Sequence, residues 1–319
     1  MALTENPPDK LFAVRCPLLA HWVIVMKSGT VAIVGRANVG KSTLLNALLK
    51  EKVAIVSDKP QTTRRRILGV AHLPGAQVVL LDTPGLHQPQ HLLNKRMIRT
   101  ALDTMREADL LYVMVEATGP PERWDRFVIE QARDAVQASG KPAFLLINKV
   151  DLVHKASVLP LIETYRTLND WTEIIPLSAR TGVNLDRLVE LTVKVLPEGE
   201  PLYDQETLTD QTMRTLAAEL IREKVLEQTR DEVPYSIAVE IDEFKEEDTL
   251  ARIAATVLVE KESHKGIIIG KRGDRLKAVG TRARLDMERL FGMKVFLQLW
   301  VKVRPGWRED ERKLDELGY

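Results

Sequence analysis

Apolar positions along the first two thirds of the chain alternate between short continuous runs and the three-to-four spacing of amphipathic helices. The continuous runs predict strands at 30–34, 67–73, 77–81, 110–115, 143–147 and 173–176. The spaced positions predict helices at 41–50, 94–107, 122–139, 156–168 and 185–196. Strands that alternate with helices are typical of a mostly parallel sheet with helices on both faces. The pattern therefore predicts an α/β domain.

A different pattern follows the proline- and glycine-containing segment 197–201, which is typical of a linker. The later positions predict a helix, two strands, a short helix, a glycine-rich turn, a long helix and a final strand. We expect the first helix at 209–228, the two strands at 235–244 and 250–260, the long helix at 271–290 and the last strand at 294–303. This α–β–β–α–α–β order predicts a second, smaller α+β domain.

These patterns divide the chain into five parts. We expect a poorly ordered extension, a first domain, a linker, a second domain and a tail that forms a short charged helix. Their predicted ranges are 1–26, 27–197, 198–207, 208–304 and 305–319. The apolar stretch 18–25 inside the extension contains His21 and no small-residue cleavage site follows it, so it does not resemble a signal peptide.

Composition narrows the class of protein. The 319 residues are 45% hydrophobic and 29% charged, a balance that suits a soluble globular protein. No apolar run reaches the roughly 18–20 residues that a membrane-spanning helix needs. Cys16 is the only cysteine, which excludes a disulfide scaffold and a cysteine-based zinc or iron–sulfur site.

The net charge of +1 hides two segments of opposite charge. Residues 204–250 hold 14 acidic and 5 basic residues, a net of −9, whereas residues 261–304 hold 12 basic and 4 acidic residues, a net of +8. A concentration of positive charge is typical of a nucleic-acid-binding surface. It is equally compatible with a solvated helix face, so charge alone leaves both interpretations open.

The first motif of chemical interest joins the strand 30–34 to the helix 41–50. It reads Gly-Arg-Ala-Asn-Val-Gly-Lys-Ser over 35–42, a G-x-x-x-x-G-K-S loop in a strand–loop–helix setting. Backbone N–H groups of such a loop surround phosphate oxygens, Lys41 can reach the β- and γ-phosphates, and the Ser42 hydroxyl can bind Mg²⁺. The expected nucleotide-binding residues here are Gly35, Asn38, Val39, Gly40, Lys41, Ser42 and Thr43.

Two further motifs specify the base. Asn148-Lys149-Val150-Asp151 follows the strand 143–147, and the Asp151 carboxylate can accept hydrogen bonds from N1–H and the 2-amino group of guanine. Lys149 can cover the base with its stem, and the Asn148 amide can serve its N7 side. Ser178-Ala179-Arg180 follows the last strand and can bring the Ala179 N–H to guanine O6.

Asp82-Thr83-Pro84-Gly85 ends another strand. Asp82 can hold Mg²⁺, and the Gly85 N–H can contact the γ-phosphate. The four motifs occur in order, each at the carboxyl end of a strand. Over residues 30–196 the chain thereby resembles the translation-factor-related class of small GTPases, with GTP or GDP and Mg²⁺ as ligands.

The resemblance also implies a loop threonine that completes the Mg²⁺ shell when the γ-phosphate is present. Thr62 and Thr63 both lie in the loop, and Thr63, next to the arginine of the Thr-Thr-Arg sequence, is the preferred candidate. The predicted metal ligands are therefore Ser42, Thr63 and Asp82.

One position departs from the usual pattern. Leu86 stands where many GTPases carry a glutamine that orients the attacking water. Together with Asn38, this leucine favours the potassium-activated group of GTPases, in which the asparagine helps to hold K⁺ against the phosphates. Asn38 is also compatible with a simple turn role, because asparagine tolerates left-handed backbone. The residues expected to take part in hydrolysis are Lys41, Thr63, Gly85 and Asn38.

The second domain contains Gly270-Lys271-Arg272-Gly273, a G-x-x-G sequence between two predicted helices. With the element order and the +8 segment, this sequence resembles a type II KH domain, whose G-x-x-G loop binds the backbone of single-stranded nucleic acid. Lys271 and Arg272 would then neutralise phosphates. A helix–turn–helix hinge with exposed charge is the alternative.

A GTPase domain followed by a type II KH domain resembles the Era family of bacterial GTPases over about 27–304, including Lys-Pro-Gln-Thr-Thr-Arg at 59–64 and Leu-Trp-Val-Lys-Val at 299–303. The resemblance implies binding to the 3′ end of 16S rRNA and assembly of the small (30S) ribosomal subunit under control of GTP. It also implies a cytoplasmic protein with peripheral contact at the inner membrane face. We expect a monomer and no DNA partner.

Two alternatives stay open at this point. The chain can be a KH-type RNA-binding protein whose nucleotide is structural and is not turned over, an interpretation that Leu86 keeps open. It can also be a GTPase of tRNA modification or signalling whose second domain docks a protein, although the basic segment 261–304 argues against this.

Overall fold

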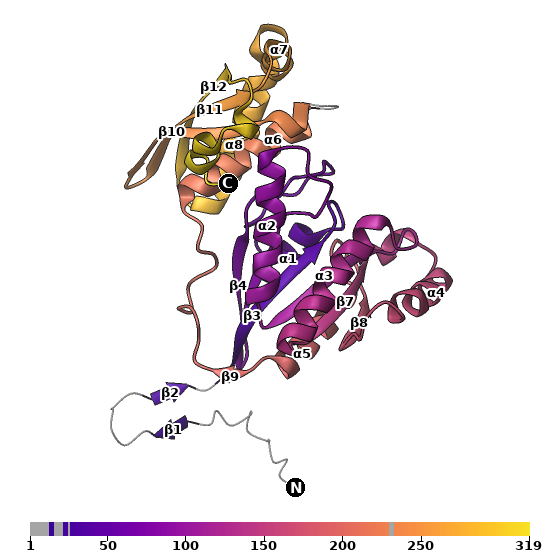
Figure 1. Cartoon of the computed structure of the whole chain (residues 1–319). Helices are drawn as coiled ribbons and strands as arrows, with labels where there is room; N and C mark the ends of the chain where they lie inside the picture. The colour runs from indigo at the N-terminus through magenta and orange to yellow at the C-terminus, as the bar shows by residue number, and fades with distance from the viewer. Residues whose placement is uncertain (1–12, 16–21, 25, 230–232) are drawn as a thin grey trace.

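The computed structural model describes residues 13–15, 22–24, 26–229 and 233–319 and shows two domains joined by an extended linker (Figure 1). Most of the predicted extension, including Cys16, lies outside these residues. Its described parts, β1 (Ala13–Arg15) and β2 (Trp22–Ile24), pair with each other in antiparallel fashion. The central strand β3 (Met26–Gly35) starts at Met26, one residue before our predicted domain boundary, because Met26 pairs with Gly199.

The described residues of the first domain form a seven-stranded sheet in the order β4-β5-β3-β6-β7-β8, with β9 beside β3. The strands after β3 are β4 (Ile67–Leu73), β5 (Ala76–Asp82), β6 (Leu110–Glu116), β7 (Ala143–Asn148), β8 (Glu173–Pro176) and β9 (Glu198–Gly199). Pairs β3–β5, β3–β6, β6–β7 and β7–β8 are parallel, whereas β4 and β9 run antiparallel to their neighbours. The predicted mostly parallel sheet is therefore confirmed.

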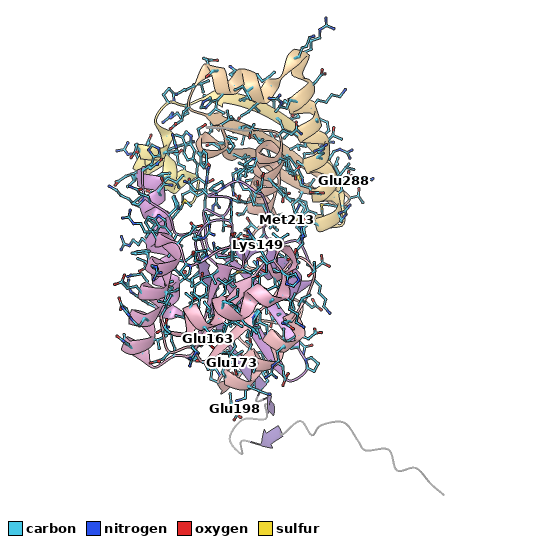
Figure 2. All side chains as sticks on the ribbon, turned by 90° about the vertical axis from the view of Figure 1, so that its right-hand side faces the viewer. Lys149, Glu163, Glu173, Glu198, Met213 and Glu288 are labelled. Carbon is cyan, nitrogen blue, oxygen red and sulfur yellow. The ribbon has the colours of Figure 1, made fainter. Side chains whose placement is uncertain are left out.

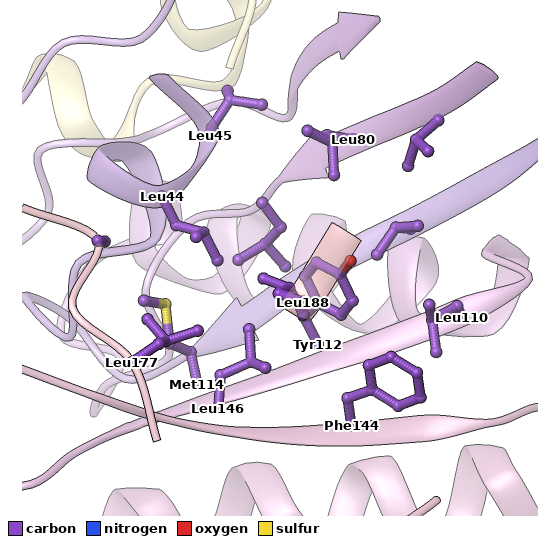
Figure 3. Close-up of a cluster of buried hydrophobic side chains, with 14 of the residues drawn as sticks. Leu44, Leu45, Leu80, Leu110, Tyr112, Met114, Phe144, Leu146, Leu177 and Leu188 are labelled. Atoms are coloured by element: carbon purple, nitrogen blue, oxygen red, sulfur yellow. The ribbon is translucent and has the colours of Figure 1, made fainter. Parts of the chain in front are cut away.

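Helices cover both faces of this sheet because alternate strand residues point to opposite sides. On one face, Val31 and Ile33 pack with α1 (Lys41–Leu49) and α5 (Leu185–Val195). On the other face, Ala32 and Val34 pack with the remaining helices of the domain. These are α2 (Leu92–Glu107), α3 (Arg123–Ser139) and α4 (Lys155–Arg166). Figure 3 shows the first of these cores, with Leu44 and Leu45 of α1 and Leu188 of α5.

This topology places four predicted motifs at one edge of the sheet. The loops that follow β3, β5 and β7 leave from the carboxyl ends of parallel strands, as does the loop after β8. Ligands of open α/β sheets bind at this edge. In Figure 2, Lys149 lies at the end of the first domain that faces the second domain, and Glu198 lies at the opposite end.

The linker is bound along the outside of the sheet. The N–H groups of Leu202 and Tyr203 donate to Gln77 Oε1 at 2.7 and 2.9 Å, and the Val70 N–H of edge strand β4 donates to Leu208 O at 2.8 Å. The linker thus satisfies part of an edge that would otherwise be open. The helix α6 (Met213–Glu227) begins four residues later than we predicted, because the Thr212 side chain caps it.

The second domain has the predicted α–β–β–α–α–β order. After α6 come β10 (Ala238–Glu247), β11 (Leu250–Val259), α7 (Glu262–Ile269), α8 (Asp274–Phe291) and β12 (Lys294–Val303). The sheet has the order β10-β11-β12, in which β11 and β12 are parallel. Our prediction of a helix from residue 271 is wrong at its start, because Arg272 adopts φ 55° and Gly273 φ 83°, so α8 begins only at Asp274.

The tail is part of the core between the domains. It forms a 3₁₀ turn, Trp307–Glu309, and the short helix α9 (Glu311–Glu316). Trp307 is 0% exposed, packs in one cluster with Leu93 and Met97 of α2, and donates its indole N–H to Ser236 O at 3.0 Å. The part of the chain that the structure describes contains no helix long and apolar enough to span a bilayer.

Candidate nucleotide and nucleic-acid sites

The loop between β3 and α1 is shaped by two left-handed residues, Asn38 (φ 66°) and Gly40 (φ 102°). A Cβ on Gly40 would lie 2.4 Å from Asn148 Nδ2, so both the backbone conformation and the close approach require glycine. Gly40 supplies no side-chain cap to α1. The first N–H groups of the helix are therefore available to an anion.

Lys41 is buried within this loop. Its Nζ donates to Arg36 O at 2.8 Å and to Gly35 O at 3.2 Å. Burial lowers the pKa of Lys41 to about 8, although the charge of Asp82 acts in the opposite direction. The ammonium group is thus held by neutral carbonyl groups, which phosphate oxygens can replace.

Three oxygen-bearing side chains meet beside Lys41. Ser42 Oγ donates to Asp82 Oδ2 at 2.6 Å and lies 2.8 Å from Thr63 Oγ1, which is itself 3.3 Å from Asp82 Oδ2. Burial raises the pKa of Asp82 to about 6, with Lys41 opposing the shift. Asp82 Oδ1 is buried and has no hydrogen-bond partner among the residues that the structure describes. Mg²⁺ prefers such oxygen ligands, so this set of residues fits the metal.

The structure distinguishes the two loop threonines. The Thr62 hydroxyl donates to Lys59 O at 2.6 Å, away from Asp82. The Thr63 hydroxyl is the one that lies with Ser42 and Asp82.

The loop after β5 lies directly against the phosphate loop. A Cβ on Gly85 would lie 2.6 Å from Ala37 Cα, so the two backbones can approach only because residue 85 is glycine. The Leu86 N–H donates to Gly35 O at 3.1 Å, and the Leu86 side chain is 1% exposed in the core beside α2 and α3. Leu86 therefore contributes packing here and presents no polar group to a water molecule.

A cavity of about 350 Å³ lies over these groups. It is lined by residues of the phosphate loop, by the segment 55–63, and by Gly85 and Lys149. Most of the predicted phosphate-binding residues, and the predicted metal ligands Ser42 and Thr63, thus surround one space.

Asp151 lies at the other end of the site. Its carboxylate accepts hydrogen bonds from Ser178 Oγ and from Arg180 Nη2, both at 2.6 Å. The hydrogen bond from Ser178 lowers the pKa of Asp151, and Arg180 adds to the effect. The carboxylate therefore stays ionised, as an acceptor of guanine N–H groups must.

Asn148 joins two loops of the site. Its Nδ2 donates to Val39 O at 2.7 Å, and its Oδ1 accepts from the Ala179 N–H at 2.9 Å. The Ala179 N–H, which we predicted to reach guanine O6, donates to Asn148 in this structure.

Glu116 is a residue of this site that the sequence analysis missed. Lys149 Nζ donates to Asn38 O at 2.8 Å and to Glu116 Oε1, and Glu116 Oε2 accepts from Arg36 Nη2 at 3.0 Å. Glu116 thus connects Lys149 with Arg36 of the phosphate loop. Glu116 could have been found from its position, because it is the last residue of strand β6. The four motifs likewise lie at the carboxyl ends of their strands.

The G-x-x-G loop connects α7 with α8. Gly270 has φ 74° and ψ −178°, and a Cβ there would lie 2.8 Å from Arg275 Cβ, so this position requires glycine. Lys271 and Arg272 between the glycines are exposed, and neither forms a salt bridge with another described residue. The loop presents two free positive charges at the N-terminus of α8, an arrangement suited to phosphates.

Next to this loop, a groove of about 400 Å³ lies between α8 and β12. Leu276, Leu297 and Leu299 give it an apolar floor, and Lys277 and Arg284 line its edge. Leu297 and Leu299 belong to the predicted strand 294–303, whereas Ile268 of the apolar stretch before the loop is 1% exposed inside the domain core.

Comparisons with known proteins agree with this architecture. Residues 30–149 match a family model described as 50S ribosome-binding GTPase, and residues 232–308 match a model of the KH domain. The chain is 52% identical to GTPase Era of Geobacter metallireducens over 92% of this chain and 98% of that protein. It is 49% identical to GTPase Era of Syntrophus aciditrophicus over 93% of this chain and 96% of that protein.

Two solved structures are similar over both domains. A single-residue variant of Era from Aquifex aeolicus, bound to GDP and AlF4⁻, has a TM-score of 0.88 and 45% identity over 92% of this chain and 99% of that chain. Era in complex with MgGDPNP and nucleotides 1506–1542 of 16S ribosomal RNA gives the same values. With relatives about half identical along nearly its whole length and both domains matched, this chain belongs to the Era family of GTPases.

Proposed function

We propose that this protein is a GTP-hydrolysing switch that binds the 3′ end of 16S rRNA and assists assembly of the small (30S) ribosomal subunit. The observation that carries the proposal is the presence of two built sites in one chain. One is the cavity over the phosphate loop, which Lys41 and Lys149 line, and the other is the basic G-x-x-G loop beside its groove. The related Era structure with MgGDPNP and a 16S rRNA fragment supports both ligands.

In the nucleotide site, the phosphates would replace the carbonyl partners of Lys41, and the N–H groups at the start of α1 would donate to them. Ser42, Thr63 and Asp82 would hold Mg²⁺, which supplies a positive charge to the β- and γ-phosphates. The Gly85 N–H would contact the γ-phosphate, and Asn148, Lys149, Asp151 and the loop 178–180 would hold guanine. Leu86 lies in the core, so we expect slow hydrolysis in the absence of a partner.

In the second domain, Gly270, Lys271, Arg272 and Gly273 would bind the RNA backbone, and the apolar groove floor would pack against splayed bases. The match to the KH model favours RNA over a docked protein. We expect the protein to lie in the cytoplasm, where the small ribosomal subunit is assembled on 16S rRNA. We also expect a monomer. Peripheral contact with the inner membrane face stays a prediction of the family resemblance.

Multiple-turnover release of phosphate from GTP, with and without a single-stranded oligonucleotide of the 16S 3′ end, tests the proposed function. We expect many turnovers per protein and a change of rate on addition of the RNA. A nucleotide that stays bound while at most one equivalent of phosphate is released would support the alternative, an RNA-binding protein with a structural nucleotide.

Potassium should stimulate this hydrolysis. The Asn38 amide donates to Asp58 O at 2.7 Å, which places a side-chain carbonyl and a backbone carbonyl close together at the phosphate end of the cavity. Such oxygens can hold K⁺ where an arginine finger would otherwise supply charge. We expect faster phosphate release in KCl than in NaCl at equal ionic strength, and loss of the difference in Asn38→Ala. Equal wild-type rates in the two salts would leave Asn38 with the turn role that its φ of 66° allows.

A further inference from the structure

The candidate magnesium ligand Thr63 lies in a segment of the first domain that the second domain holds on both sides. The contacts involve the residue before Thr63 and the two residues after it. They come from α6 and from the segments 234–237 and 317–319.

On one side of Thr63, Arg222 of α6 donates from Nη2 to the carbonyl oxygen of Thr62. Arg222 is 0% exposed, and its guanidinium group is fixed by Glu219, with Nε donating to Oε1 at 3.0 Å. All residues of α6 from Leu216 to Leu226 are buried. A helix that is buried all round packs against structure on every side, so α6 has little freedom to move alone.

On the other side of Thr63, the Arg64 side chain enters the second domain. Its guanidinium group donates to Ile237 O and, at 3.3 and 3.4 Å, to the carbonyl oxygens of Tyr235 and Pro234. The group also lies 5.7 Å from the ring centre of Trp307 and 5.8 Å from that of Tyr319. Arg64 is 3% exposed, so these cation–π contacts are desolvated and correspondingly strong.

The next residue, Arg65, makes the same two kinds of contact, a hydrogen bond to a carbonyl group and a cation–π contact, with the tail. Arg65 donates to Leu317 O and lies 5.0 Å over the Tyr319 ring. In Figure 1 the C-terminal end of the chain lies beside α2 and α6, where the two domains meet. The residues that flank Thr63 in the chain are therefore held by groups that belong to the second domain and its tail.

We infer that Arg222, with Tyr319 of the tail, acts as a positioning residue for Thr63 and so sets the affinity of the magnesium site for the triphosphate form of the nucleotide. The inference rests on the proposed function, in which Thr63 completes the Mg²⁺ shell only when a γ-phosphate is present. Loss of these contacts should then weaken binding of a GTP analogue and spare binding of GDP. A role limited to holding the domains together would weaken both alike.

The test compares the affinities of the full-length protein for GDPNP and GDP, each with Mg²⁺. Arg222→Met alone would leave the buried carboxylate of Glu219 without its partner, so the variant is the pair Glu219→Gln and Arg222→Met. We expect its affinity for GDPNP to fall about tenfold while its affinity for GDP stays within about twofold. Tyr319→Leu, which leaves Arg222 in place, should reduce the GDPNP affinity by several-fold and likewise spare GDP.

Lys52→Met is the matched control, because it also removes an ion pair between the domains. Lys52 Nζ contacts Glu223 at 2.6 Å and Asp286 at 3.2 Å, and both acids keep Lys224 as a partner. This variant should keep the wild-type ratio of the two affinities. Should the paired variant fail to fold, the Tyr319→Leu ratio decides.

The inference would be overturned if the folded variants kept the wild-type ratio of GDPNP affinity to GDP affinity, or if Lys52→Met changed that ratio by the same factor. Failure of the wild type to bind either nucleotide would instead contradict the proposed function.

Discussion

Asp151→Asn should convert a guanine-selective site into one that prefers xanthine. The Asp151 carboxylate is held by Ser178 and Arg180 at 2.6 Å, so its position does not depend on the nucleotide. Guanine offers it two N–H donors, and the substituted amide can accept from one of them but opposes the other. Two charged hydrogen bonds contribute about 1.5–3 kcal/mol each, so GTP affinity should fall roughly 10²- to 10⁴-fold.

Xanthosine triphosphate carries an oxygen in place of the 2-amino group, and the new amide can donate to it. Competition of GTP, ATP and xanthosine triphosphate against a fluorescent guanine nucleotide measures the switch. Asp186→Asn, on the exposed first turn of α5, makes the same chemical change outside the site and should keep wild-type selectivity. Equal affinity of the wild type for ATP and GTP would contradict the role of Asp151.

Replacement of Lys271 and Arg272 together by aspartate should abolish RNA binding. The two side chains are exposed between Gly270 and Gly273, and their reversal would place negative charge against a phosphate backbone. GTP binding should persist, because Lys41, Asp82 and Asp151 belong to the first domain. For the wild type, the logarithm of RNA affinity should fall with the logarithm of salt concentration by about 0.7 for each phosphate neutralised.

Titration of the full-length protein with a single-stranded oligonucleotide of the 16S 3′ end, at several salt concentrations, measures this loss. The pair Arg123→Asp and Arg133→Asp, exposed on α3 of the first domain, changes the net charge equally and should leave RNA affinity nearly unchanged. A wild-type affinity in the Lys271 and Arg272 variant would assign the loop to a helix–turn–helix hinge.

Much of the fold could be predicted from local patterns. The central strands β5, β6 and β7 of the first domain are buried on both faces, so each reads as an apolar run, and motif loops follow directly from the ends of β5 and β7. The second domain could be predicted from element order and the G-x-x-G sequence. Errors occurred at boundaries such as Thr212 and Asp274, where a side-chain cap or a left-handed residue sets the start of a helix.

The sites, like the helix boundaries, could be predicted only as far as local sequence determines them. The motif sequences were sufficient to propose Lys41, Ser42 and Asp82, because phosphate and metal chemistry need those residue types at that spacing. The choice of Thr63 over Thr62 rested on sequence resemblance, and only the hydrogen bonds show which hydroxyl lies beside Asp82.

The sequence by itself determined the two kinds of domain, the guanine nucleotide motifs and the basic loop, since each depends on residues close together in the chain. Only the tertiary structure decided how the domains meet. Arg222, Trp307 and Tyr319 are far apart in sequence and carry no local motif, yet they converge on Arg64 and the loop of Thr63. Contacts of this kind depend on how two folded domains pack, a property that no pattern within a single segment contains.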